Sequence, residues 1–197
     1  IGYTEYATSV IADRKAEPRD DLMSVLCHAE VDGDSLSHDE LVHESLLILI
    51  GGDETTRHVI SGGAWQLLAD RRQWELLAAD PGKLTVGIEE MLRWVTPIKN
   101  MNRTATRDVV VGGQQIHEGD NVLLLYPSAN RDEDVFDDPF RFDVERTPNE
   151  HVAFGFGTHF CLGNSLARLE LRVMFEQLLA RLPDLEIFGQ KHGLRIV

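Results

Sequence analysis

Residues 38–68 contain no proline, and this uninterrupted stretch is the feature that most constrains the fold. It follows Ser37 and includes Glu40, a pair that can form a capping box in which each side chain accepts a hydrogen bond from an otherwise unpaired backbone N–H. With a rise of 1.5 Å per residue, such a helix would be on the order of 45 Å long. The stretch therefore predicts one long helix, from about 38 to 68, that crosses most of a domain.

Other parts of the chain follow helical spacing or short strand patterns. Apolar spacing and end signals predict further helices at about 4–15, 21–33, 71–79, 84–94 and 163–182. Between residues 102 and 125 short β segments alternate with glycine turns, and residues 130–150 predict an ordered irregular connection. We find no sequence boundary that divides the chain, so the pattern predicts a mainly α fold with small β elements in a single domain.

Composition excludes several classes of protein. The chain has 197 residues, of which 43% are hydrophobic and 26% charged, as in ordinary folded domains. Its formal net charge of -14 repels phosphates and argues against nucleic acid as a partner. The longest strongly apolar run, residues 46–50, is too short to span a bilayer. Only two cysteines, Cys27 and Cys161, are present, so we expect a reducing, cytoplasmic location.

Residues 154–163, FGFGTHFCLG, surround Cys161 with glycines and aromatic side chains just before a predicted helix. Backbone N–H groups and the dipole at a helix N-terminus favour a thiolate, which is the form of cysteine that binds iron. Glycines allow the backbone to approach a flat macrocycle, and aromatic side chains exclude water from it. The alternative is a buried structural cysteine after a glycine turn, which explains a lone cysteine but not the whole pattern.

The long predicted helix contains GGDETT at 51–56 and a second glycine pair, Gly62 and Gly63. Each glycine inside a helix costs about 1 kcal/mol relative to alanine, so four of them need a compensating reason. A flat cofactor or substrate lying against Gly51 and Gly52 supplies one, because a Cβ there would hold it away. Close crossing of another helix is the alternative reason.

Together these motifs resemble the C-terminal half of a cytochrome P-450, a haem-thiolate monooxygenase. The order Phe-Gly-x-Gly-x-His-x-Cys-x-Gly is similar to the haem-binding loop of that superfamily without a departure. The resemblance implies haem b with Cys161 as the axial ligand of its iron. It also implies that Phe154 packs near the sulfur, that His159 contacts a haem propionate, and that Gly155 and Gly163 shape the loop.

The GGDETT segment is similar to the oxygen-activation motif of the same superfamily. This resemblance implies that Thr55 holds water at the reaction site and that Glu54 feeds protons inward from solvent. Gly51 and Gly52 would then lie against the cofactor. Thr56 has a more structural role.

The segment EEMLRW at 89–94 places Glu90 and Arg93 on one helix face. Such pairs are usually exposed and worth a few tenths of a kcal/mol. The resemblance instead implies a buried triad with Arg146. It also implies that Arg103 binds a haem propionate, although a surface arginine at a strand end is the alternative. Three further residues would border the substrate pocket: Val95, Pro97 and Ile98.

A closer resemblance is to soluble actinobacterial enzymes that oxidise the terminal side-chain carbon of cholesterol and cholest-4-en-3-one. The segments GGDETTRHVISGG, TPIKNMNR and HVAFGFGTHFCLGN carry it. It implies an apolar, sterol-like substrate and electrons from NAD(P)H delivered by a ferredoxin reductase and a ferredoxin. The order of motifs predicts that residues 1–197 are the C-terminal part of a single cytochrome P-450 domain.

The chain begins at Ile1 without an initiator Met, and members of the superfamily are about twice its length, so we expect a fragment. Two other interpretations remain open from the residues. One is a haem-free, inactive fragment of such an enzyme, and the other is a metal-free helical interaction protein.

Overall fold

A computed structural model describes residues 2–187 of the chain. The fold is mainly α with small β elements, as the sequence predicts. Residues pack into two compact units, Ile1–Glu54 and Thr55–Val197, which are described separately below. None of the helices within residues 2–187 has the length and apolar content needed to cross a membrane.

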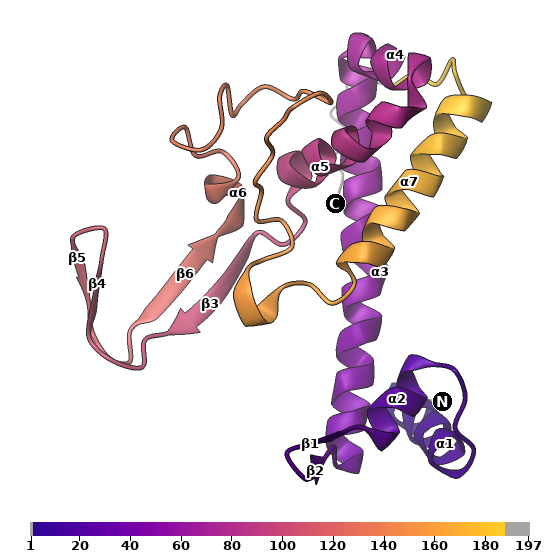
Figure 1. Cartoon of the computed structure of the whole chain (residues 1–197), viewed down its shortest axis with the longest axis vertical. Helices are drawn as coiled ribbons and strands as arrows, with labels where there is room; N and C mark the ends of the chain where they lie inside the picture. Colours follow the sequence, from indigo (N-terminus) through magenta and orange to yellow (C-terminus); the bar gives the residue numbers. More distant parts are fainter. Residues whose placement is uncertain (1, 188–197) are drawn as a thin grey trace. The chain divides into compact units, whose positions relative to one another are not determined.

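The elements follow the order shown in Figure 1. The helices are α1 (Tyr3–Ala16), α2 (Leu22–His28), α3 (His38–Ala69), α4 (Arg71–Ala79), α5 (Leu84–Val95), α6 (Tyr126–Ala129) and α7 (Asn164–Arg181), with 3-10 turns η1 (Pro81–Lys83) and η2 (Gly157–His159). The strands are β1 (Glu30–Val31), β2 (Asp34–Ser35), β3 (Asn100–Thr104), β4 (Val109–Val111), β5 (Gln114–Ile116) and β6 (Asn121–Leu125).

The first unit is held by a small apolar core between α1 and the beginning of α3. Ala7 and Ile11 are buried there with Leu41 and Val42. The predicted capping box forms at the start of α3: the Ser37 N–H donates to Glu40 Oε2 at 2.8 Å, and the Glu40 N–H donates to Ser37 Oγ at 3.3 Å. These bonds explain why the long helix begins where it does.

Helix α2 is shorter than the sequence predicts. We expected it to end near residues 32–33, but it ends at His28, and the chain then forms a β1–β2 hairpin. Asp32 and Gly33 form the turn with φ angles of 55° and 83°. An Asp-Gly pair suits the positive φ angles of a two-residue hairpin turn, and this local preference ends the helix early.

The second unit has a larger core built from α4, α5, α7 and the part of α3 that begins at Thr55. Its buried side chains include Val59, Leu67, Trp74, Leu77, Leu84, Ile88, Met91, Leu92, Leu171 and Phe175. Figure 1 shows α5 and α7 lying alongside one another. This packing fixes α7, and hence the segment that leads into it, against α5.

Glycines in α3 have different surroundings. A Cβ added to Gly62 would lie 2.7 Å from Val95 Cγ2, and one added to Gly63 would lie 2.9 Å from Met91 Sδ. Close crossing of α5 therefore explains this pair. A Cβ added to Gly51 or Gly52 would meet no atom within 4 Å, so packing gives no reason for those two glycines.

Residues 100–125 form two antiparallel two-stranded sheets. Strands β3 and β6 pair with Arg103 opposite Val122, and β4 and β5 are joined by Gly112 and Gly113 at positive φ. Strand β3 begins at Asn100, two residues before the predicted β region. Residues 130–150 contain no regular helix or strand, as predicted.

Candidate functional site

Cys161 lies between η2 and α7, in a loop that is closed by backbone hydrogen bonds. Its N–H donates to the Phe154 carbonyl at 2.9 Å. Its own carbonyl accepts from Asn164 twice, from the backbone N–H at 3.3 Å and from Nδ2 at 2.8 Å. Cys161 is half-buried, and its thiol forms no disulfide. The loop therefore holds the backbone on both sides of the sulfur while leaving the thiol free to bind a ligand.

Glycine is required at two positions of this loop. Gly155 and Gly157 have φ angles of 75° and 70°, which side chains rarely adopt. A Cβ at Gly155 would also lie 3.4 Å from the His159 carbonyl oxygen. The tight turn therefore depends on Gly155 and Gly157. It places the His159 backbone next to Gly155.

Apolar side chains flank Cys161 and face outward. Phe156 is 88% exposed, Leu162 is 79% exposed and Phe160 is 48% exposed. Phe154 is half-buried and contacts Phe160 edge to face, with ring centroids 6.2 Å apart. Exposed apolar groups gathered at one loop mark a surface suited to an apolar ligand or partner.

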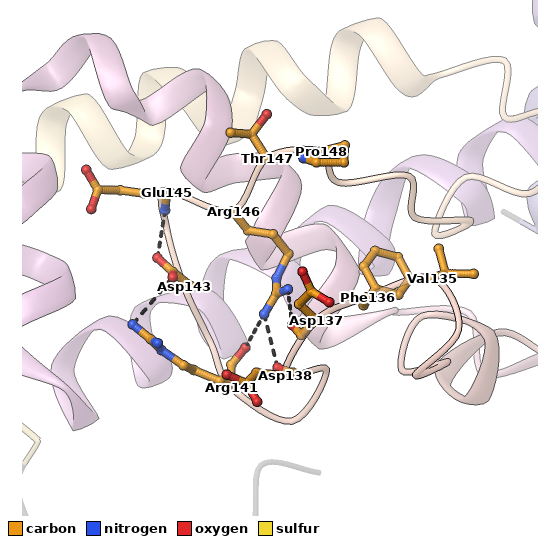
Figure 2. A pocket seen from close by; sticks show the side chains of 10 residues that line it. All are labelled: Val135, Phe136, Asp137, Asp138, Arg141, Asp143, Glu145, Arg146, Thr147 and Pro148. Carbon is orange, nitrogen blue, oxygen red and sulfur yellow. Dashed lines mark hydrogen bonds and ion pairs between the residues drawn. The ribbon is translucent and has the colours of Figure 1, made fainter.

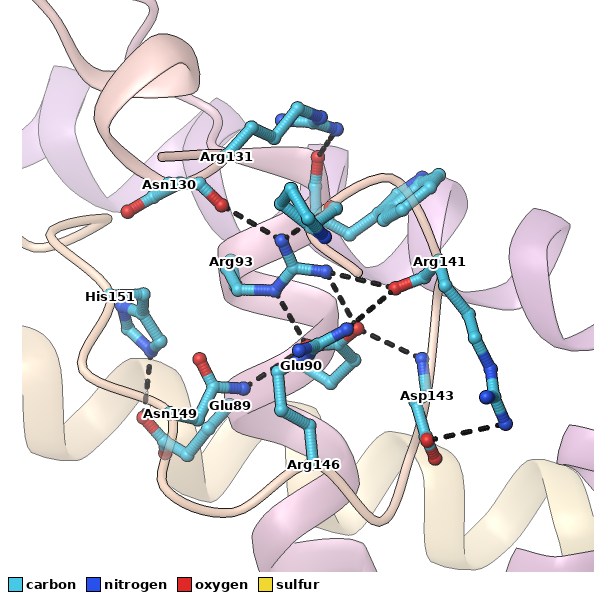
Figure 3. Close-up of polar contacts among 12 residues, drawn as sticks. Glu89, Glu90, Arg93, Asn130, Arg131, Arg141, Asp143, Arg146, Asn149 and His151 are labelled. Carbon is cyan, nitrogen blue, oxygen red and sulfur yellow. Dashed lines mark hydrogen bonds and ion pairs between the residues drawn. The ribbon is translucent and has the colours of Figure 1, made fainter. Parts of the chain in front are cut away.

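Glu90 and Arg93 are fully buried in α5 and bind each other through two parallel hydrogen bonds (Figure 3). Arg93 Nε donates to Glu90 Oε2 at 2.7 Å, and Arg93 Nη2 donates to Oε1 at 2.8 Å. The other N–H groups of Arg93 donate to three carbonyl groups, those of Asn130, Pro139 and Arg141. All five donors of the guanidinium are used.

Glu90 also receives hydrogen bonds from the irregular segment. Arg146 Nε lies 3.2 Å from Glu90 Oε2, so the structure brings together the predicted residues Glu90, Arg93 and Arg146. The Asp143 N–H and Asn149 Nδ2 donate to the same carboxylate at 2.9 and 3.1 Å. This cluster fixes residues 130–150 to α5, immediately before the Cys161 loop.

Arg146 also donates to the carbonyl groups of Asp137, Asp138 and Arg141 (Figure 2). These residues line a cavity of about 300 Å³ within the segment 135–148. The predicted substrate-pocket residues do not line it. Polar and charged groups dominate this cavity, so it is a poor candidate for an apolar ligand.

Asn130 and Thr96 form a buried polar cluster that the sequence did not predict. Asn130 Nδ2 donates to Thr96 Oγ1 at 2.9 Å, while Asn130 Oδ1 accepts from the Val152 N–H at 2.8 Å. Thr96 ends α5 in the left-handed conformation, with φ of 43°. A buried asparagine has no sequence signal of its own, but a residue before proline is disfavoured in helix, which was a sign that Thr96 would redirect the chain.

A second missed cluster joins α5 to α7 through Glu89. Arg168 Nε and Nη2 donate to the two Glu89 oxygens at 2.7 and 2.9 Å, and His151 Nε2 lies 2.9 Å from Oε2. Burial alone raises the pKa of Glu89, but the hydrogen bonds from Arg168 and His151 outweigh it and lower this pKa to about 2. The pairing of Glu89 with a basic residue some 80 positions later could not be read from local spacing.

The remaining predicted site residues lie on separate elements. Glu54 is exposed and Thr55 half-buried, as neighbours in α3. Arg103 is exposed on β3, where its Nη1 donates to the Asn102 carbonyl at 2.8 Å, and His159 is exposed in η2. The other three, Val95, Pro97 and Ile98, are half-buried around the end of α5.

Comparison with known proteins identifies the class that this fold and loop define. The family model described as "Cytochrome P450" matches residues 84–184, which include α5, the irregular segment and the Cys161 loop. The chain belongs to the cytochrome P-450 family.

Several of the matching relatives carry a more particular name. A "Steroid C26-monooxygenase" of Mycolicibacterium smegmatis is 60% identical over 185 residues, which are 94% of this chain and 46% of that protein. A protein of the same name from Rhodococcus jostii is 42% identical over 191 residues, which are 96% of this chain and 40% of that protein. The chain thus spans less than half the length of these curated relatives.

Solved structures agree with the fold. A Bacillus megaterium crystal structure in complex with testosterone has a TM-score of 0.90 and 37% identity, covering 97% of this chain and 53% of that one. A Bacillus subtilis cytochrome P-450 of a bacillaene polyketide synthase has a TM-score of 0.88 and 40% identity, covering 94% of this chain and 48% of that one.

Membership of this family implies haem, and the residues around Cys161 fit that group. A Cβ at Gly157 or Gly163 would meet no atom within 4 Å, so the backbone there is open to close approach. Phe156 and Leu162 present apolar surface beside a free thiol, which is the donor that a haem-thiolate site requires. The donor chemistry and the exposed apolar surface are therefore both suitable.

Proposed function

We propose that the protein is a haem-dependent monooxygenase that inserts one oxygen atom of O₂ into a C–H bond of an apolar substrate. The observation that carries this proposal is the Cys161 loop, which holds a free thiol between glycines and exposed aromatic side chains. The second oxygen atom leaves as water, which requires two electrons and two protons. Haem with a thiolate ligand supplies the oxygen chemistry when it is bound.

In this proposal, Cys161 is the axial ligand of haem b. It lies just before the 18-residue helix α7, whose N-terminal backbone N–H groups favour negative charge on the sulfur. Phe154 packs beside the loop, while Gly155 and Gly163 shape it and allow close approach of the cofactor. Arg103 and His159 are exposed donors suited to the haem propionates.

Thr55 and Glu54 are the proposed catalytic residues of α3. The half-buried Thr55 hydroxyl would hold a water molecule and hand on its proton, and the exposed Glu54 carboxylate can take up protons from solvent. Gly51 and Gly52 leave open space on the same helix, which suits the close approach of a flat group.

We propose a sterol side chain of the cholesterol or cholest-4-en-3-one type as the substrate. The relatives named steroid C26-monooxygenase, up to 60% identical, support this class. Three residues where α5 ends and the chain turns at Thr96 would border the pocket: Val95, Pro97 and Ile98. Electrons would come from NAD(P)H through a ferredoxin reductase and a ferredoxin. Two free cysteines suit a reducing cytoplasm.

The absorbance of the reduced, CO-bound protein tests this proposal. We expect a red-shifted Soret band of the thiolate type, which Cys161→Ser abolishes and Cys27→Ala leaves in place. Cys27 lies in α2 and is the matched control for loss of a thiol. Absence of haem from the unaltered protein would instead indicate the inactive, haem-free alternative. Titration with cholest-4-en-3-one, followed by the spin-state change in the Soret band, tests the substrate class.

A further inference from the structure

Adjacent acidic residues of α5 serve separate networks. Glu90 binds Arg93, Arg146 and the irregular segment that precedes the Cys161 loop. Glu89 turns instead toward α7 and accepts two hydrogen bonds from Arg168 in a bidentate pair. Figure 3 shows Glu89 and Glu90 directed to different partners, with His151 beside Glu89. Glu89 therefore has a role that the buried triad does not explain.

Arg168 contacts both residues that hold the backbone of Cys161. Its guanidinium lies 4.6 Å from the Phe154 ring centroid, and the Phe154 carbonyl accepts from the Cys161 N–H. Its Nη1 donates to Asn164 Oδ1 at 2.9 Å, while Asn164 Nδ2 donates to the Cys161 carbonyl. The Arg168 guanidinium thus contacts both Phe154 and Asn164, the two residues that form hydrogen bonds with the Cys161 backbone.

Glu89 has a third partner, His151, which bonds to the same oxygen, Oε2, as Arg168 Nη2. His151 is 4% exposed, and its Nδ1 accepts from the Ala153 N–H at 3.2 Å. Nε2 therefore carries the ring proton and donates to Glu89 Oε2. A bidentate arginine pair with a third donor fixes the carboxylate in one orientation.

We propose that Glu89 and Arg168 are positioning residues that fix the Cys161 loop against α5 and together set the reduction potential of the iron bound there. This inference rests on the proposed function, because it requires haem at Cys161. Neither residue is proposed to touch the substrate or the reacting atoms.

The two charges act on reduction with opposite signs. Reduction adds an electron to the haem centre, so a nearby cation favours it and a nearby anion opposes it. Arg168 is linked to Cys161 through Asn164, which accepts from Arg168 and donates to the Cys161 carbonyl, so its charge lies close to the sulfur. The hydrogen bond to Glu89 raises the pKa of Arg168, burial opposes this, and the charges of Glu89 and Cys161 add to the increase. Glu89 therefore offsets part of the Arg168 charge.

The test is spectroelectrochemical titration of the haem-loaded protein. Glu89→Gln leaves the cation without its partner, so we expect a higher potential than in the unaltered protein. Arg168→Gln removes the cation, so we expect a lower one. In the double variant the two opposite shifts should largely cancel, because the net charge near the haem is then the same as in the unaltered protein. A role in loop stability alone would move both single variants in the same direction.

Arg168→Lys separates charge from geometry, since lysine keeps the charge but cannot form the bidentate pair. It should keep the potential closer to that of the unaltered protein than Arg168→Gln does, while losing the thiolate-type Soret band faster in urea. Arg172→Gln is the matched control, because Arg172 forms an exposed pair with Glu176 on the same helix. It should change neither measurement.

Unchanged potentials in both single variants, or shifts of the same sign, would overturn the inference. If Arg168→Gln loads no haem, Glu89→Gln decides the inference: a higher potential supports it, and an unchanged or lower potential overturns it. Failure of the proposed function gives a different result, because the unaltered protein would then show no thiolate-type Soret band at all.

Discussion

Arg93 and Glu90 form a fully buried ion pair in which both carboxylate oxygens bind the same guanidinium. Arg93→Ala would leave the carboxylate buried without its principal partner, which costs about 3–5 kcal/mol. Because the pair anchors the segment that leads into the Cys161 loop, we also expect loss of haem uptake. Urea denaturation and the haem absorbance per protein measure the two effects.

Arg72→Ala is the control for this prediction, since Arg72 is largely exposed and lies 3.9 Å from Asp70. Exposed pairs contribute at most about 1 kcal/mol. A normal haem content in the Arg93→Ala protein would contradict the anchoring role.

Thr55→Ala should separate electron consumption from product formation. Without the hydroxyl that we propose to hand on the proton, we expect NADH oxidation to continue while little hydroxylated product forms and hydrogen peroxide accumulates. Ser61→Ala removes a hydroxyl from the same helix, where it bonds to backbone carbonyl groups, and should leave coupling intact. Fully coupled turnover by Thr55→Ala would refute the assignment.

Acid should weaken the Glu89 cluster within a defined range. The pKa of Glu89 falls from its ordinary value of 4.5 to about 2, the hydrogen bonds from Arg168 and His151 outweighing burial. A lowered carboxyl pKa means that its contribution to stability is complete above pH 4.5 and is lost as pH falls toward 2. The difference in unfolding free energy between the unaltered protein and Glu89→Gln should therefore shrink across that range. A constant difference would contradict the ion pair.

Alanine at two glycines of α3 should have opposite effects on the haem-free chain. Gly62→Ala places a methyl group against the stiff side chain of Val95, and such overpacking costs typically about 1–3 kcal/mol. Gly52→Ala meets no neighbour and should gain up to about 1 kcal/mol of helix propensity. Thermal unfolding of both variants measures the signs. Equal effects would show that the two glycines have similar surroundings.

Local sequence patterns were sufficient to predict those helices and turns whose ends are set by residues close by in the chain. The capping box at Ser37 and the absence of proline predicted α3, and the glycine pair at 112–113 marked a hairpin. The end of α2 was predicted wrongly, because hairpin pairing on both sides of the Asp32–Gly33 turn outweighed helical spacing. Close approach of α5, which explains Gly62, depends on tertiary packing and was one of two alternatives left open.

The candidate site was predicted where a motif is contiguous, as at the Cys161 loop. It was missed where partners are distant. Asn130 joins Thr96 to Val152, and Glu89 joins Arg168 to His151, through bonds that no periodicity reveals. The triad with Arg146 was predicted only through family resemblance, since spacing alone favours an exposed pair.

Glu89 and Glu90 are consecutive residues of α5, and they bind different partners. Successive residues of an α-helix are turned by about 100° around its axis. Inserting or deleting one residue of α5 before Glu89 would turn Glu89, Glu90 and Arg93 together by this angle relative to Leu84, so the helix could not keep both its apolar face and the pairs with Arg146 and Arg168. Length variation among related sequences should therefore concentrate in the exposed β4–β5 hairpin and be absent from α5.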